Sequence, residues 1–570
     1  MARLSFAEHM RIAAISAGRR RRGMVARAYG LPAVRWLRSP RRIDQLLIVP
    51  QDLRTVDPSF WFEVRHGQFG LAGSLARLDG HSPFDLPPPG RAWERSLHGF
   101  AWLRHMHAAG DPEAAEAARR LAIEWTIRND GGDGVGWQPD ILARRIISWL
   151  SHAGMLLEDC DEQSYDIITT SLGAQLVRLS SAWREAEAGH ARLLSLTALL
   201  LADLSVAGRE RSIDADLGLF LDQLARQIRR DGSHTSRNAT VLVDLLLDLL
   251  PLKECFRSRG RPQPDELGAA IARMLEHLKS QRLGDGLLAR FNGVGVPQPA
   301  HLAKVLAYGD IGAPIEPAPA AETTASGYVR LVRGETVLVA DCAGPPPLEL
   351  AAAAQAGCLS FELSAGTTVL LANGGLPGSG HADWLAAARA TASHNTLVLG
   401  EASSARLIRS RKLEALLGQP AIRGPAHVKA AAINGDDGSV GIEASHDGYL
   451  DQFGVLHHRQ IVLEAGGRRI VGTDRLKPPR GTLRLKRDVP FSIHFHLHPK
   501  ATCRRTDKVG TVSIEAGGQR WQLVAEGARI GIEQSVHFAD AVGPLEALQI
   551  VLRGATFGET EVRWALTRLG

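Results

Sequence analysis

The chain has 570 residues, of which 45% are hydrophobic and 22% are charged. This length exceeds what one hydrophobic core usually holds, so it predicts two domains, and the composition excludes a chain that is disordered throughout. No stretch predicts a membrane span, because even ATVLVDLLLDLLPL is interrupted by Asp244, Asp248 and Pro251.

The net charge of +6 is concentrated at the N-terminus. Residues 1–42 contain eleven Arg and one acid, Glu8, whereas the rest of the chain has 56 basic and 60 acidic residues, a net of −4. The body therefore shows no charge excess of the kind that predicts a specific nucleic-acid partner. We interpret residues 1–45 as a basic arm that is able to contact anionic surfaces.

The beginning of the chain does not resemble a signal peptide, because Glu8, His9 and Arg11 interrupt it before an apolar core of adequate length forms. The five Cys show neither close pairs nor metal-ligand spacing, a pattern typical of reduced thiols. Both observations favour a cytoplasmic protein.

Residues 46–308 are predicted to form a domain of helical hairpins. Apolar residues recur there at spacings of three and four, as in LHGFAWLRHM and DILARRIISWLSHAGMLL, with breaks every twenty residues or so. Residues 309–327 are rich in Pro and read as a linker. From 328 to 570 the period changes to two, as in YVRLVRG, TVLVADC and FSIHFHLHP, which predicts an antiparallel β-sandwich.

A series of motifs gives the chain a family resemblance. FWFEVRHGQFGLAG, GWQPDILARRIISWL, RRDGSHTSRN, GDGLLARFNG, ARATASHNTLVLG and HDGYLDQFGVLHHRQIVLE occur in this order, and over about residues 60–560 the chain resembles the heparinase II/III-like family. The resemblance implies an incomplete α/α toroid packed on an antiparallel β-sandwich. It also implies a lyase that cleaves a uronic-acid polysaccharide by β-elimination, and it raises the cell envelope or periplasm as an alternative location.

β-Elimination requires groups that neutralise the uronate carboxylate, a base that removes the proton at C5, and an acid for the leaving oxygen. In RRDGSHTSRN, we expect His234 and Asn238 to be catalytic and Arg237 to bind the carboxylate at the start of the next helix. Asn238 or Ser236 as a simple N-cap is the alternative. The resemblance leads us to expect a Tyr shortly after this loop, but the chain has Val241 and Leu242 there.

The resemblance places ARATASHNTLVLG on the sandwich face that closes on the toroid. His394 is therefore our first candidate for a proton carrier, with Asn395 and Arg389 binding substrate; a His satisfied by backbone is the alternative. In HDGYLDQFG, Tyr449 is a candidate to replace the missing Tyr and His446 to bind substrate, unless the segment is only a turn. Arg145 and Trp137 are expected to line the groove.

The segment FSIHFHLHP is a candidate metal site. In FSIHFHLHP the alternation places His494, His496 and His498 on one face, and His496 and His498 are spaced to share a Zn or Ca ion. The resemblance implies further ligands just before the LSFEL strand, where this chain has Gln355 and Gly357. No metal or other cofactor is therefore predicted with certainty.

Three functions agree with these patterns. The first is a lyase that acts on an acidic polysaccharide. The second is a non-catalytic carbohydrate-binding or envelope-assembly protein that has lost the catalytic Tyr. The third is a glycoside hydrolase on a similar toroid, which requires two carboxylates that face each other in the groove.

Overall fold

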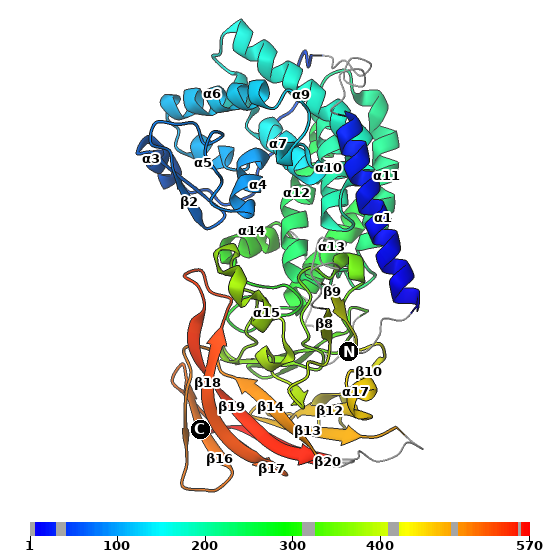
Figure 1. Cartoon of the computed structure of the whole chain (residues 1–570). Helices are drawn as coiled ribbons and strands as arrows, with labels where there is room; N and C mark the ends of the chain where they lie inside the picture. The colour runs from blue at the N-terminus through cyan, green and yellow to red at the C-terminus, as the bar shows by residue number, and fades with distance from the viewer. Residues whose placement is uncertain are drawn as a thin grey trace.

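The computed structural model describes residues 6–29, 42–309, 325–408, 421–479, 488–556 and 560–569. Helices are followed by antiparallel sheets, in the order that the sequence predicts (Figure 1). Residues 310–324 of the predicted linker lie outside the described residues. The helices of the first part are α1 (Phe6–Tyr29), α3 (Ser59–Arg65), α4 (Arg91–Gly99), α5 (Leu103–Ala108), α6 (Pro112–Arg128), α7 (Pro139–Ser151), α8 (Ala153–Leu157), α9 (Glu162–Ala182), α10 (His190–Ser205), α11 (Ile213–Gln227), α12 (Ala239–Ser258), α13 (Asp265–Ser280) and α14 (Pro299–Gly309).

Four of these helices form the inside of the helical domain. α7 packs between α4 and α10, and α10 also packs against α12. Residues 193–205 of α10 are buried without a break, as expected of a helix that is surrounded by others. α6, α9, α11 and α13 alternate with these inner helices along the chain, so the N-terminal ends of the inner helices meet at one end of the domain.

Capping residues define where several helices begin. The Asp111 side chain accepts a hydrogen bond from the Glu113 backbone N–H, with Pro112 at the first helical position of α6. Asp161 caps α9 in the same way by accepting from Ser164. A short hairpin of β1 (Gln68–Leu71) and β2 (Ser74–Arg77) precedes α4.

The second part is built from antiparallel sheets. The largest has the strand order β10-β11-β12-β13-β20-β17-β16-β15, and two four-stranded sheets have the orders β18-β19-β14-β7 and β3-β4-β5-β6. Their bounds are β3 (Tyr328–Arg333), β4 (Thr336–Asp341), β5 (Phe361–Ala365), β6 (Thr368–Leu371), β7 (Leu397–Leu399), β10 (Val428–Asn434), β11 (Val440–His446), β12 (Leu456–Leu463), β13 (Arg469–Lys477), β14 (Val489–His496), β15 (Thr502–Arg505), β16 (Thr511–Ala516), β17 (Gln519–Glu526), β18 (Arg529–His537), β19 (Leu545–Thr556) and β20 (Thr560–Leu569).

Alternating side chains fill the core of the sandwich. In β12 every second residue is buried, from His457 to Leu463, and Trp564 of β20 stacks on Phe361 of β5 with ring centroids 5.7 Å apart. The remaining elements of this part are the pair β8 (Arg406–Ile408) and β9 (Ala421–Arg423) and the short helices α15 (Leu385–Ala388) and α17 (Leu450–Phe453).

The predicted N-terminal arm contains a helix. α1 begins near the sandwich part and runs beside the toroid (Figure 1). Arg21 pairs with Glu185 of the toroid at 3.1 Å, and Arg11 pairs with Glu349 of the sandwich part at 2.8 Å. The sequence analysis did not predict this helix, because its apolar residues lack a pronounced stripe and Arg19–Arg22 dominate the pattern.

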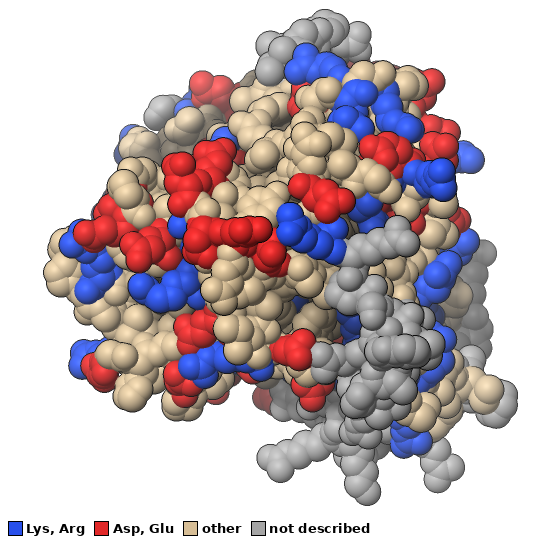
Figure 2. Space-filling model, turned by 90° about the horizontal axis from the view of Figure 1, so that it is seen from above, with Lys and Arg blue, Asp and Glu red and all other residues tan. Residues whose placement is uncertain are grey.

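Acidic and basic side chains intermingle over the end of the molecule that Figure 2 shows. This distribution agrees with the near-neutral body that the sequence predicts. Among the described helices, none has the length and apolar character needed to cross a membrane.

Candidate functional site

The loop before α12 is held by contacts within the protein. Arg237 has a left-handed backbone, with φ of 60°, and its side chain forms a buried ion pair with Asp341 at the end of β4. Its other N–H groups donate to Ser326 O at 2.9 Å and Gly344 O at 2.7 Å. The guanidinium also lies 4.8 Å from the ring centroid of Tyr328. Its N–H groups therefore bind the sandwich part, where we had expected them to face a ligand carboxylate.

Asn238 and His234 are also satisfied locally. The Asn238 side chain caps α12 by accepting from Thr240 N at 2.9 Å, so the capping alternative is observed. His234 Nδ1 lies 2.7 Å from Ser236 Oγ and Nε2 lies 3.2 Å from Gln227 Oε1. Burial lowers the pKa of His234 to about 3. A neutral imidazole with both nitrogens engaged must break a contact before it can move a proton.

His394 lies inside the sandwich part and is completely buried. Its Nδ1 lies 2.8 Å from Ala390 O, and its Nε2 has no hydrogen-bond partner among the described residues. A Cβ on Gly357 would lie 2.7 Å from His394 Cδ2, so the glycine leaves just enough room for the ring. Burial lowers the pKa of His394 to about 4. Its proposed role as a proton carrier would require this packing to open.

The two neighbours predicted to bind substrate are likewise enclosed. The Asn395 side chain donates to Phe361 O at 2.8 Å and accepts from His496 N at 2.6 Å, which joins β5 to β14. Arg389 is 1% exposed and donates to Ala354 O at 2.7 Å and Ala351 O at 3.1 Å. Both side chains donate hydrogen bonds to backbone carbonyls. These internal contacts account for a polar residue at each position without a ligand.

Tyr449 and His446 lie in the interior of the sandwich. The Tyr449 hydroxyl donates to Leu397 O at 2.6 Å, and burial raises its pKa above the ordinary value. His446 Nδ1 accepts from Gly448 N at 3.0 Å, and its Nε2 lies 3.2 Å from His457 Nδ1. His457 Nε2 in turn lies 2.7 Å from Asp474 Oδ1. The segment is thus a turn, as in the alternative interpretation, and His446 links it to a series of buried hydrogen bonds through His457 and Asp474.

His494 and His496 of FSIHFHLHP share a side of β14, which ends at His496, and His498 follows the strand. The rings of His494 and His496 stack with centroids 5.7 Å apart. His496 Nδ1 lies 2.7 Å from Ser535 Oγ and its Nε2 lies 2.9 Å from Ala392 O, so both nitrogens are engaged. His498 lies near His537, with centroids 6.0 Å apart. Within the described ranges, no group of three or more His, Cys, Asp or Glu has a metal-binding arrangement.

Arg145 and Trp137 belong to the aromatic interior of the toroid. Arg145 is buried over the ring of Trp125 at 3.7 Å and donates to His98 O and Gly136 O at 2.9 and 2.8 Å. Trp137 is half-buried, and its indole N–H donates to Asn129 O at 3.0 Å. Trp137 therefore keeps part of its surface accessible, whereas Arg145 does not.

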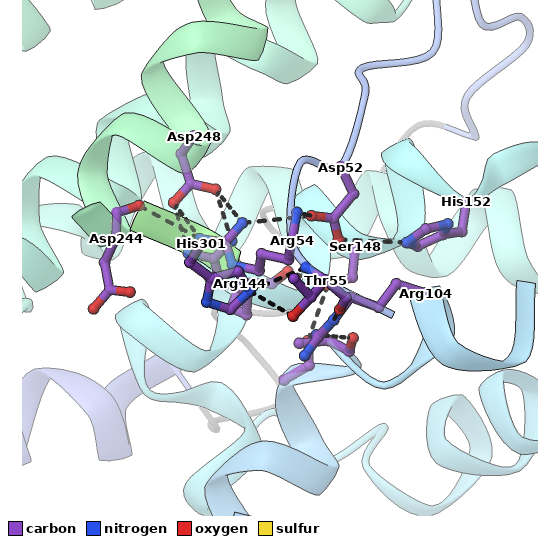
Figure 3. A network of polar contacts seen from close by, with 12 residues as sticks. Asp52, Arg54, Thr55, Arg104, Arg144, Ser148, His152, Asp244, Asp248 and His301 are labelled. Atoms are coloured by element: carbon purple, nitrogen blue, oxygen red, sulfur yellow. Dashed lines mark hydrogen bonds and ion pairs between the residues drawn. The ribbon is translucent and has the colours of Figure 1, made fainter. Parts of the chain in front are cut away.

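A polar network that the sequence analysis missed crosses the inside of the toroid (Figure 3). At its centre the Asp248 carboxylate accepts two hydrogen bonds from Arg54, at 2.8 and 3.0 Å, and two from Arg144, at 2.8 and 2.7 Å. These two guanidiniums hold the pKa of Asp248 well below its usual range. Asp52 extends the network, because it lies 3.7 Å from Arg54 and 3.6 Å from His152.

Two groups at the edge of this network keep free polar atoms. The Asp244 carboxylate points away from the Asp248 ion pairs in Figure 3 and makes no hydrogen bond within the described part of the chain. His190, at the start of α10, has a buried Nε2 without a partner among those residues. Burial lowers the pKa of His190, and the nearby Asp244 opposes this effect. Only the i to i+4 spacing of Asp244 and Asp248 could have suggested the network from sequence.

Comparisons with known proteins agree with this architecture. Residues 315–565 match the family model "Heparinase II/III-like, C-terminal". FtsZ-localized protein C of Caulobacter vibrioides is 32% identical over 532 residues, which cover 91% of this chain and 89% of that protein. The chain belongs to the heparinase II/III-like family.

Two solved structures show the family fold. A crystal structure of heparinase III has a TM-score of 0.71 at 12% identity, with 94% of this chain and 88% of that chain covered. A mutant of the heparan sulfate lyase HepC from Pedobacter heparinus has a TM-score of 0.63 at 14% identity, with 96% and 88% covered. The predicted fold class, an incomplete toroid followed by an antiparallel sandwich, is confirmed.

Proposed function

We propose that this family member binds an acidic, uronic-acid-containing polysaccharide and does not cleave it with the groups that the motifs suggested. One observation carries this proposal: the predicted acid and base, Tyr449 and His394, are both buried in the sandwich and bonded to backbone carbonyls. Val241 and Leu242 at the start of α12 supply no substitute for the Tyr that the family leads us to expect. A polysaccharide lyase fold without its proton carriers would keep affinity and lose turnover.

The α12 carboxylates argue against a glycoside hydrolase. Such an enzyme needs one carboxyl group that stays protonated and a second that stays ionised. Asp248 is held as a carboxylate by Arg54 and Arg144, so it is unsuited to be the acid opposite Asp244.

β-Elimination that starts at His190 is the second candidate. Its unpartnered Nε2 and lowered pKa leave a neutral imidazole that can accept a proton. Arg144, which contributes to the charge environment of His190, would stand near the substrate carboxylate.

One pair of measurements separates the two candidates. The unaltered chain is titrated with heparan sulfate and polygalacturonate, and the ultraviolet absorbance of unsaturated uronate is followed in the same samples. Binding without absorbance growth is expected. Absorbance growth that His190→Ala abolishes and His394→Ala leaves intact would establish the second candidate, whereas loss with His394→Ala would restore His394 as the proton carrier.

We also infer that the protein localises with FtsZ, as the name of the Caulobacter relative says of that protein. Support comes from the 32% identity over nearly the whole length of both chains. A fluorescent fusion to the C-terminus should form a band with FtsZ at the division site. A uniform distribution in dividing cells would contradict this inference.

A further inference from the structure

A cavity of about 670 Å³ lies between α1 and the N-terminal ends of α4 and α7. We call it the rim pocket. Arg19 and Arg22 line it from α1, Arg91 and Arg95 line it from α4, and Trp137 lies between them in the loop before α7. The volume falls in the range of roughly 300 to 1,000 Å³ that small-molecule sites occupy.

We propose that the rim pocket binds a sugar acid unit of an acidic saccharide and that the N-terminal helix forms one of its walls. This inference rests on the proposed function, and it adds the place of binding and a role for α1.

The charges of the pocket favour a ligand with a carboxylate. Five Arg and four acids line it, an excess of one positive charge. Asp140 pairs with Arg95, Glu185 pairs with Arg21, and Glu187 interacts with Arg22. Arg91 is exposed and forms no ion pair with another described residue. Arg22 is partly buried, and this burial lowers its pKa. A carboxylate between Arg22 and Arg91 would offset that desolvation through charge-assisted hydrogen bonds.

Trp137 supplies an apolar surface for the sugar ring. One side of its indole contacts Trp125, with centroids 5.7 Å apart, and lies 5.6 Å from the Arg145 guanidinium. The hydrogen bond to Asn129 O fixes the orientation of the indole, and its remaining surface lines the pocket. An aromatic ring that keeps part of its surface exposed to solvent can stack on a sugar ring, while the hydroxyl groups of the sugar contact polar neighbours.

The attachment of α1 permits a ligand to enter. Ile12 and Ser16 are the fully buried residues among the described side chains of α1. The Arg11 and Glu349 side chains are 51% and 34% exposed, and such exposed pairs contribute little to stability. In the second pair Arg21 is 64% exposed, whereas Glu185 is 12% exposed. A ligand that contacts Arg22 should hold α1 in place at the rim.

The test uses the full chain and short oligosaccharides prepared from heparan sulfate and polygalacturonate. Arg22→Gln and Arg91→Gln should each raise Kd by about tenfold or more, the loss expected for one charge-assisted hydrogen bond. Arg226→Gln is the matched control, because it removes the same charge from an exposed site on α11; we expect a change under about twofold. In parallel, the oligosaccharide should slow tryptic cleavage after Arg20 and Arg21 in the unaltered chain.

The outcomes distinguish the two proposals. If an oligosaccharide binds but neither substitution weakens it and the cleavage rate stays unchanged, the rim pocket is not the site, whereas the proposed function stands. If no oligosaccharide binds the unaltered chain, the proposed function and the rim-pocket assignment are both wrong. Equal weakening by Arg22→Gln and Arg226→Gln would indicate only a general charge effect and would overturn the assignment.

Discussion

Replacing Arg237 with Gln should destabilise the protein strongly and change saccharide binding little. The guanidinium is 3% exposed and pairs with Asp341, which is 2% exposed. Gln would leave the Asp341 carboxylate buried with the hydrogen bond from Asn292, at 2.8 Å, as its main compensation. The contacts to Ser326 O and Gly344 O would also be lost.

The size of the effect follows from the burial of both charges. Removal of one partner of a buried ion pair costs about 3 to 5 kcal/mol of the free energy of unfolding. For a unit of about 150 to 250 residues, each kcal/mol corresponds to roughly 2 to 4 °C in Tm, so a fall on the order of 10 °C is expected.

Thermal unfolding followed by circular dichroism measures this change, with Arg226→Gln as the exposed control. The double variant Arg237→Gln with Asp341→Asn removes both charges and should recover much of the loss. A Tm that hardly moves, together with a tenfold weaker affinity for an acidic oligosaccharide, would refute the reasoning and show that Arg237 serves a ligand.

Three further predictions concern buried groups. Tyr449→Phe should lower stability by about 1 to 2 kcal/mol in urea unfolding, because Leu397 O loses its donor, and the same variant should bind saccharide normally. Glu362 of β5, 3.6 Å from Arg290, has a pKa raised by burial from 4.5 to about 7. The folded state therefore binds a proton at Glu362 more tightly than the unfolded state, and the stability that this proton contributes is lost as pH rises from about 4.5 to 7. Glu362→Gln should therefore change the free energy of unfolding more favourably at pH 8 than at pH 5, by about 3 kcal/mol. Equal changes at both pH values would contradict this. His394 has its pKa lowered from 6.5 to about 4, so the unfolded state binds the extra proton and stability falls as pH decreases through that window. His394→Gln should reduce the slope of stability against pH there by up to about 1.4 kcal/mol per pH unit. An unchanged slope in urea titrations would show that folding does not lower the pKa of His394.

The periodicity of the sequence predicted the architecture well. Apolar residues at spacings of three and four do form α7 and α10, and the alternation in FSIHFHLHP does form β14. Local patterns suffice there because a helix or strand places its own apolar residues on the face that packs. α1 escaped prediction because its apolar residues lack a pronounced stripe, and its attachment to Glu185 and Glu349 joins residues that lie far apart along the chain.

The candidate site was harder to predict, because a motif identifies residue types and not their partners. His394, Asn395 and Tyr449 have the chemistry of proton transfer and carboxylate binding, yet each contacts a backbone carbonyl: His394 that of Ala390 four residues earlier, and Asn395 and Tyr449 those of distant segments. Gly357 contributes to this outcome, since any side chain there would displace the His394 ring. The network around Asp248 joins residues separated by 104 and 194 positions, so the spacing of Asp244 and Asp248 on α12 could not reveal the Arg partners.

The shared carboxylate of Asp248 also restricts how related sequences can diverge. It is the common partner of Arg54, from the segment before α3, and of Arg144, from α7. Loss of Asp248 alone would leave two guanidiniums facing each other inside the toroid, and loss of either Arg alone would leave the other to balance the charge. Asp248 should therefore be replaced among relatives only together with Arg54 and Arg144, whereas either Arg alone can be replaced while Asp248 and the other Arg are kept.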